Sequence, residues 1–234
     1  MEKVIYILTL FCCALQCRAQ QNLFNVPSSD LTEKNNHFIQ YQANLSFGGI
    51  QNNLTYTYGL GKNFEAGINA YEINFSNIYK PRFSENISDY TVPYSPLVMI
   101  NLQKGFEINK HFKIGIGAET GSSINFHLCN FSFINTNTNL FNNKLRIMGG
   151  AYYSNRILTG NGNNFGLLAG MEIPLFKDKF VFTSDYVSGK NSISVGVIGF
   201  ALKILKHLVF SAGYQYAGYH SPNNNGVVFE LTKI

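Results

Sequence analysis

Residues His37–Phe47 read HFIQYQANLSF, and from Ile39 onward apolar and polar side chains alternate strictly. One face of this stretch holds Ile39, Tyr41, Ala43, Leu45 and Phe47, and the other holds Gln40, Gln42, Asn44 and Ser46. Side chains of a β-strand point to opposite faces with a period of two. The stretch therefore predicts a strand with one apolar face and one polar face.

Similar segments recur to the last residue, and they follow a predicted export signal at residues 1–19. The first residues, Met1–Lys3, carry a positive charge, and Val4–Leu15 is an apolar run too short to span a bilayer as a helix. Cleavage is expected after the small residue Ala19. Strands with one apolar and one polar face, placed behind a signal peptide, are typical of a barrel in a bacterial outer membrane.

The cysteines of the first segment raise the alternative of a lipid-anchored N-terminus. Lipid attachment requires a small residue before the cysteine, whereas Gln16 precedes Cys17 and Phe11 precedes Cys12. Simple cleavage is therefore preferred. Cleavage leaves Cys129 as the sole cysteine, so no internal disulfide is expected in the mature chain.

The composition fits a wall that faces lipid. Only 13% of the residues are charged, against about 25% in typical soluble proteins. Aromatic residues make up 15% of the chain, all of them Phe and Tyr. The net charge of +5 is spread without a basic cluster, so nucleic acid is not expected as a partner. Outer-membrane lipid and small solutes are the expected partners, and the oligomeric state is left open.

The fold class predicted is all-β, an antiparallel transmembrane β-barrel of about twelve strands. Residues 20–36 are expected to form a periplasmic N-terminal lead-in, and residues 37–234 a single barrel domain. The expected strands are 37–47, 53–60, a strand from Phe64, 98–103, 112–119, about 126–135, 145–153, 165–173, 180–186, 193–197, 208–216 and 227–232. The alternation becomes weak at residues 122–143, and if that segment holds no strand pair the count is ten.

The connections support this count. Those after even strands are expected to be short, near 61–63, 107–110, 174–178 and 203–206. Those after strands 3, 7 and 11 are long, with residues 76–93 the longest. Short periplasmic turns and long outer loops are the pattern of outer-membrane barrels. The exception is a loop expected at 136–143, because it follows the even strand 6. A further loop is expected at 48–52, between strands 1 and 2. A soluble β-sandwich or lipocalin-like barrel, with its apolar faces inward, is the alternative.

Charged residues at inward strand positions are the candidate lumen-lining residues. They are Glu65, Lys113, Glu119, Lys144, Arg146, Glu172, Asp185 and Glu230. Charges are costly against lipid, so this placement is expected in any barrel. One interpretation is a constriction that selects solutes by charge, and the other is a closed core of ion pairs. Glycines at expected inward positions leave space and favour a narrow channel: Gly67, Gly115, Gly117, Gly166, Gly170, Gly196 and Gly213.

Short motifs add a family resemblance. Tyr58–Leu60, Glu65–Gly67, Gly166–Ile173 and Asp185–Gly189 resemble small porin-like outer-membrane barrels of Bacteroidetes-type bacteria. The chain is also similar to a transporter-like family linked to phenol meta-cleavage pathways. The resemblance implies a barrel and a transport-like function, and it transfers no site residues.

Passive passage of small solutes is therefore the main expectation. The first alternative is a closed or surface-binding barrel that acts through its outer loops. The second is a lipid-modifying enzyme, for which His220 and Ser221 are the nearest pair, although adjacent residues of a strand face opposite ways. No catalytic residue, metal site or cofactor is predicted, because the dispersed histidines and the single mature cysteine match no ligand spacing.

Overall fold

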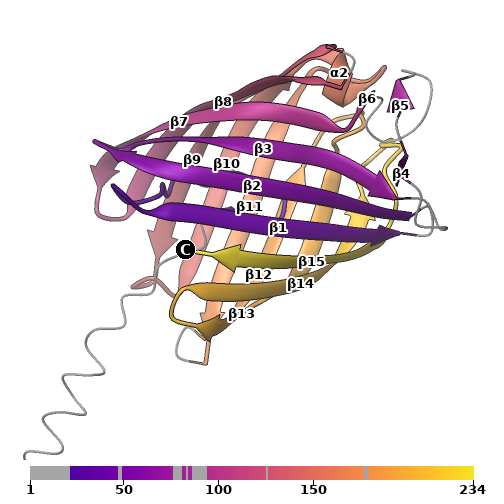
Figure 1. The fold of residues 1–234 in the computed structure, drawn as a ribbon. Coiled ribbons are helices and arrows are strands. Elements are labelled where there is room, and N and C mark those ends of the chain that lie inside the picture. The colour runs from indigo at the N-terminus through magenta and orange to yellow at the C-terminus, as the bar shows by residue number, and fades with distance from the viewer. Residues whose placement is uncertain are drawn as a thin grey trace, which may run out of the picture.

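The computed structural model describes residues 22–46, 49–75, 81–82, 84–85, 94–124, 126–176 and 179–234. They form a closed antiparallel β-barrel (Figure 1). Its twelve wall strands are β1 (His37–Ser46), β2 (Gly49–Gly61), β3 (Phe64–Phe75), β7 (Leu97–Asn109), β8 (Phe112–Ser123), β9 (Leu128–Leu140), β10 (Leu145–Ser154), β11 (Phe165–Leu175), β12 (Phe180–Val187), β13 (Val195–Leu205), β14 (Leu208–Ala217) and β15 (Gly226–Lys233). Short elements at one end are β4 (Pro81–Arg82), β5 (Ser84–Glu85), β6 (Tyr94–Ser95) and α2 (Arg156–Thr159).

The barrel closes through its first and last strands. β1 pairs with β15 from Ile39 opposite Lys233 to Ser46 opposite Gly226. Every other wall strand pairs with the two strands beside it, so no backbone edge of the wall is left to face lipid. The prediction of twelve strands is confirmed.

The segment that made ten strands an alternative holds one long strand. β9 runs to Leu140, and its partner β10 begins at Leu145, so the expected loop at 136–143 is wrong. Thr136 and Thr138 alternate with Asn135 and Asn137, whose buried amides face the lumen. Threonine suits strands and the lumen accepts asparagine, so a composition that resembled a loop belongs to a strand. The expected loop at 48–52 is also wrong, since β2 starts at Gly49.

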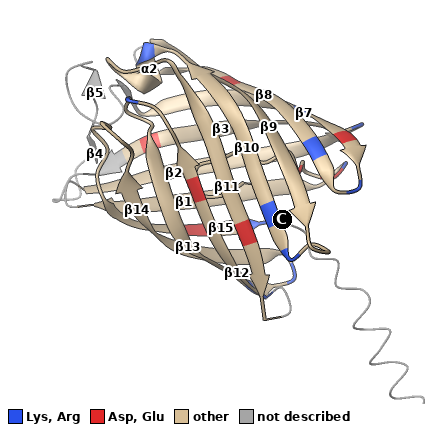
Figure 2. Ribbon diagram, turned by 180° about the vertical axis from the view of Figure 1, so that it is seen from behind, with Lys and Arg blue, Asp and Glu red and all other residues tan. Residues whose placement is uncertain are grey.

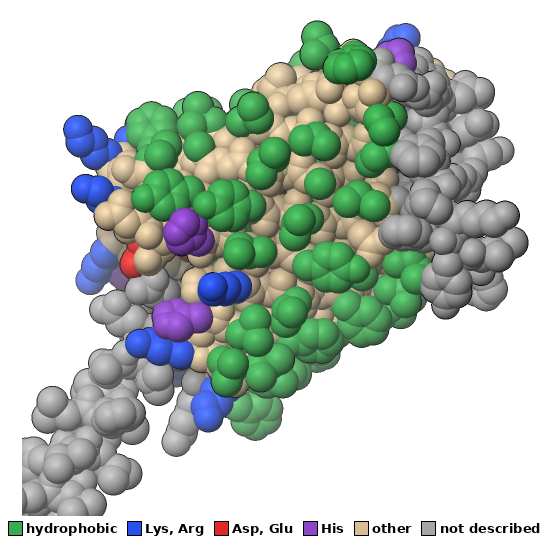
Figure 3. All heavy atoms as spheres, viewed as in Figure 1, with side chains coloured by type: hydrophobic (Ala, Val, Ile, Leu, Met, Phe, Trp, Pro, Cys, Tyr) green, Lys and Arg blue, Asp and Glu red, His purple; other side chains and the backbone are tan. Residues whose placement is uncertain are grey.

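The apolar faces point outward, as a transmembrane barrel requires. Ile100 is 67% exposed and Leu102 51%, whereas Gln40, Gln42 and Asn44 are buried on the inner side. Figure 3 shows apolar side chains spread over the outer wall. The soluble alternative is wrong, because its apolar faces would point inward. No helix among the described residues is long and apolar enough to span a membrane.

One strand has the opposite register to that predicted. Val195 and Val197 of β13 are buried in the lumen, while Ile198, Phe200 and Leu202 face outward. Gly196 also lies on the outer side, beside the ring of Tyr216. Val197 is inward because it packs with residues of an apolar patch on the inner wall, which the next subsection describes, and Val195 lines a cavity beside it. A rule that places every apolar side chain outward fails at such a patch.

The two ends of the barrel differ. One end, here called the turn end, has the tight connections 62–63, 110–111, 141–144 and 206–207. The other, here called the loop end, carries α2 and β4 to β6 (Figure 1). Figure 2 shows Lys and Arg mostly at the turn end and few charges along the wall. The predicted signal peptide, 1–19, lies outside the described residues, and so does most of the 76–93 loop.

Candidate functional site: the lumen and its N-terminal segment

Residues 22–36, here called the N-terminal segment, run through the barrel: residues 22–32 are covered inside it, and residues 33–36 are exposed at the turn end. The segment begins with a tight turn, in which Asn22 bridges Pro27 and the Leu23 amide donates to the Val26 carbonyl at 3.1 Å. Leu23, Phe24 and Val26 are at most 4% exposed. The sequence led us to expect a periplasmic lead-in here, and the structure adds that the segment packs against the inner wall.

The tip of the segment rests on an apolar patch of the wall. Leu23 and Val26 pack with Met148, Tyr152, Leu168 and Val187 and with Phe133. Phe24 packs with Val197 and Val228. Each buried side chain of this size stabilises the packed state by about 1.5–3 kcal/mol. The patch explains why β13 turns Val197 inward.

Two inward glycines make room for this tip. A Cβ atom at Gly170 would lie 2.2 Å from the Leu23 side chain, and one at Gly213 would lie 3.2 Å from the Phe24 ring. The predicted role of the inward glycines, to leave an open path, is therefore wrong at these positions. Their missing side chains are replaced by residues of the N-terminal segment.

The Asp185 carboxylate holds the tip through hydrogen bonds from the backbone amides of the segment. Its Oδ2 accepts hydrogen bonds from the amides of Asn25 at 2.5 Å and Val26 at 3.0 Å. The Asn25 side chain donates to the other carboxylate oxygen at 3.4 Å. Because Asp185 is only 2% exposed, these bonds form away from bulk water. Hydrogen bonds to a charged group stabilise by about 1.5–3 kcal/mol each.

Arg146 ties the middle of the segment to the wall. Its Nη2 contacts Asp30 Oδ2 at 2.7 Å and donates to Ser28 Oγ at 2.5 Å. Its Nη1 donates to Glu172, the residue directly opposite on β11. Lys113 Nζ approaches the second oxygen of Asp30 at 2.8 Å. Two cations thus meet two carboxylates, one of which belongs to the segment.

Neutral contacts complete the crossing of the lumen. Asn135 of β9 donates to the Pro27 carbonyl at 2.6 Å, and Gln103 of β7 donates to the Ser28 carbonyl at 2.7 Å. Further along, the Thr32 amide donates to Glu65 of β3 at 2.7 Å. The segment therefore passes from β12 on one side of the barrel to β3 and β2 on the other, immediately before β1 starts.

The contacts of Asp30 with Arg146 and Lys113, together with those of Asp185 with the tip, are here called the latch. The charge of Asp30 gives the latch a defined pH dependence. Burial alone would raise the pKa of Asp30, but Arg146 and Lys113, with hydrogen bonds from Lys113 and Asn137, lower it below its usual value of 3.8. A lowered carboxyl pKa adds stability that is complete above the unfolded value and is lost as pH falls through the folded value. We expect Asp30→Asn to lower the free energy of unfolding by about 1.5–3 kcal/mol at pH 7 and equally at pH 5.

Urea titrations of both proteins in vesicles across pH measure this difference. The difference in unfolding free energy should shrink only below about pH 3.8, where the unfolded wild-type chain binds the proton first and the folded protein binds it at lower pH. A difference that vanishes between pH 7 and pH 5 would contradict the ionised latch.

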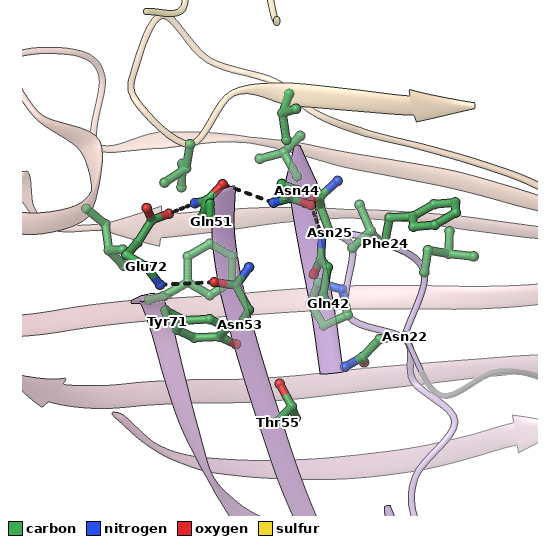
Figure 4. A pocket seen from close by; sticks show the side chains of 18 of the residues that line it. Asn22, Phe24, Asn25, Gln42, Asn44, Gln51, Asn53, Thr55, Tyr71 and Glu72 are labelled. Carbon is green, nitrogen blue, oxygen red and sulfur yellow. Dashed lines mark hydrogen bonds between the residues drawn. The ribbon is translucent and has the colours of Figure 1, made fainter. Parts of the chain in front are cut away.

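The segment lies between two cavities. The cavity at the loop end has a volume of about 180 Å³ and contacts residues 22–27 (Figure 4). The cavity at the turn end has a volume of about 530 Å³ and contacts residues 29–34. The N-terminal segment thus lines both cavities.

The predicted lumen residues fall into three groups. Five of them hold or adjoin the segment: Glu65, Lys113, Arg146, Glu172 and Asp185. Glu119 lies at the loop-end cavity, where it accepts a hydrogen bond from the Tyr71 hydroxyl at 3.3 Å, and Glu230 is buried on β15. Lys144 is exposed in the turn between β9 and β10, away from the others.

The segment's own residues were not among the candidates. Asp30 and the backbone amides of Asn25 and Val26 complete the site. Asn135 and Gln103, which donate to the carbonyls of Pro27 and Ser28, are uncharged and so were not candidates either. The available signal was the apolar content of residues 23–26, which is unusual for a solvated lead-in. Among the described residues no cluster of three or more His, Cys, Asp or Glu side chains is placed to hold a metal ion.

His220 and Ser221 do not form a nucleophile and base pair in this structure. The His220 ring packs edge-on against Tyr219 at 4.1 Å, and the Ser221 hydroxyl donates to the Asn191 carbonyl at 2.9 Å. An activated serine needs its hydroxyl within hydrogen-bond reach of the base. This geometry gives the lipid-enzyme alternative no support.

The fold is similar to that of solved porins. The KdgM porin matches with a TM-score of 0.62 at 10% sequence identity, over 84% of this chain and 98% of that chain. The NanC porin matches with a TM-score of 0.56 at 10% identity, with the same coverage. The chain has a porin-type fold.

The porin-type fold supports an outer-membrane location, in agreement with the apolar outer wall. At 10% identity the likeness concerns the fold and carries no substrate. No protein-family description matches the sequence, and no curated protein matches it either.

Proposed function

We propose that this porin-type barrel is an outer-membrane channel for small solutes, and that its N-terminal segment closes the lumen. The observation that carries the proposal is the course of residues 22–36, which cross the lumen between two cavities and are held by an apolar tip and by polar contacts. A barrel that only needed a filled interior would have no use for a cavity on each side of the filling.

The closing element can leave without disturbing the wall. The segment continues into the barrel at the start of β1, where its last residues also exchange backbone hydrogen bonds with Gly59 of β2. Residues 22–33 make no strand pairing with the wall. If cleavage occurs after Ala19, as the sequence predicts, the segment has a free end close to its tip. Its release toward the turn end then requires only the loss of the contacts described above.

Planar-bilayer recording of the refolded full chain tests the channel. We expect a channel that is closed most of the time and that shows brief, reproducible openings, because the latch is strong but not covalent. A difference in gel migration between boiled and unboiled samples controls for correct folding. A steady large conductance would contradict closure by the segment.

The alternative of a closed barrel that acts through its outer loops makes the opposite prediction. In that case the wild type stays silent, and so does a variant whose latch is removed. The finer expectations from the sequence remain proposals: export by a cleaved signal peptide, a Bacteroidetes-type source, and kinship with the phenol meta-pathway transporter-like family.

A further inference from the structure

We infer that the loop-end cavity binds one uncharged, ring-shaped polyol of the size of a single sugar unit. This inference rests on the channel function proposed above, because it names the class of solute that the lumen accepts. Three properties of the cavity carry it: an ordered wall of side-chain amides, an apolar wall that faces it, and the lack of a basic side chain among the described residues that line it.

The amide wall is an ordered chain of hydrogen bonds across three strands (Figure 4). Gln42 of β1 donates to Asn44 Oδ1 at 3.1 Å, and Asn44 donates to Gln51 Oε1 of β2 at 3.0 Å. Gln51 in turn donates to the Glu72 carboxylate of β3. The carboxylate accepts only, so it fixes the direction of every amide behind it. Each amide has two N–H groups and two acceptor sites, and the chain uses only part of that capacity.

A β-bulge turns the end of this chain into the cavity. Tyr71 and Glu72 together lie opposite Asn53, because the register between β2 and β3 shifts there. Glu72 has a φ of 59°, which non-glycine residues rarely adopt, and its amide donates to Asn53 Oδ1 at 3.0 Å. Bulges re-aim side chains. Here the bulge brings two consecutive polar side chains, Tyr71 and Glu72, to the cavity.

The facing wall is apolar. It is formed by Phe24 of the segment, Phe131 of β9, Leu158 of α2 and Ile193 and Val195 before and within β13. A ligand held between these walls needs many hydrogen-bonding groups together with apolar surface. A sugar ring has both, since hydroxyls surround it and its faces carry C–H groups. A simple phenol would satisfy only one or two members of the amide wall.

The size and the charge narrow the class further. The volume of about 180 Å³ is slightly larger than that of a cavity of about 150 Å³ known to hold benzene, so one ring fits. Among the described residues that line the cavity, the charged side chains are Glu72 and Glu119, and none is basic. The carboxylate of an acidic solute would lose its water here without meeting a cation among these residues, which is costly. The solute is therefore an uncharged sugar rather than an acidic one.

Ligand-observed NMR on the refolded full chain tests this inference with D-glucose and D-glucuronate as probes. The two probes share a ring and differ by one carboxylate. The detergent should be free of sugar headgroups, such as an amine oxide, so that it does not compete. We expect saturation transfer to glucose and none to glucuronate at equal concentration. Equal transfer to both, or none to glucose, would overturn the inference.

Gln51→Leu removes the central amide and should weaken glucose binding by at least about tenfold, as expected for the loss of one or two hydrogen bonds. Asn161→Leu changes an exposed amide after α2 and should leave binding unchanged. If Gln51→Leu fails the gel-migration control, Tyr71→Phe provides a milder second variant. Unchanged glucose affinity in a folded Gln51→Leu or Tyr71→Phe protein would overturn the inference.

The two proposals can fail separately. Channel openings without glucose binding would overturn the sugar site and leave the channel intact. Glucose binding by a barrel that stays silent in the bilayer would overturn the channel, and with it the role of the sugar as a transported solute.

Discussion

Asp185→Ala should raise the ratio of open to closed channels by about a hundredfold or more in planar bilayers. The carboxylate accepts the backbone amides of Asn25 and Val26, and without it both buried N–H groups lose their partner. Each such bond to a charged group is worth about 1.5–3 kcal/mol, and about 1.4 kcal/mol shifts a two-state equilibrium tenfold. The closed state should therefore lose its advantage while the wall stays paired.

Asp185→Asn is the matched control. The asparagine oxygen can still accept both backbone amides in the position of Oδ2, so this variant should open much less often than Asp185→Ala. Equal opening of the two variants would show that the charge, and not the acceptor, holds the tip. No opening in either variant would contradict the proposal that the segment closes a channel.

Arg146→Met should lower the free energy of unfolding by about 3–5 kcal/mol, the largest stability change that we expect from a single substitution in this chain. The guanidinium is 5% exposed and pairs with both Asp30 and Glu172. Methionine has a similar length but no charge, so it leaves Glu172 buried without its cation. Urea titration in lipid vesicles, followed by gel migration, measures the change.

The double variant Arg146→Met with Glu172→Met separates charge from packing. Replacing both partners of a buried ion pair by apolar residues is often close to neutral, so much of the lost stability should return. Asp30 keeps Lys113 as a partner in this background. A single variant within about 0.5 kcal/mol of the wild type would contradict a structural role for Arg146.

The fold could be predicted because lipid imposes a simple rule on every wall strand. The alternation at Ile39–Phe47 and its repeats place apolar side chains outside, and the structure agrees on nearly all strands. The rule fails where the lumen itself is apolar: Val197 packs on Phe24, and Val195 lines the loop-end cavity. It also misses the Thr and Asn residues near the end of β9, whose polar side chains suit both a loop and a lumen-facing strand.

The site could be predicted only in part. Charge is excluded from lipid, so Arg146, Glu172 and Asp185 were expected to face the lumen. What each one touches depends on register and on a segment far away in the sequence. Arg146 meets Glu172 because β10 and β11 pair at that residue, and it meets Asp30 because the chain folds back over more than a hundred positions. Local composition carries neither fact.

The pairing of β1 with β15 has a consequence for how the protein is assembled. The seam joins β1, which directly follows the N-terminal segment, to β15, so the barrel wall cannot close until β15 is in place. Folding is thereby tied to contacts of the greatest sequence separation, which form slowly. A chain that stops before β15 would leave β1 and β14 with unpaired backbone edges in the hydrocarbon, where nothing else can satisfy them. Stable insertion into the membrane therefore requires that β15 is present to close the wall.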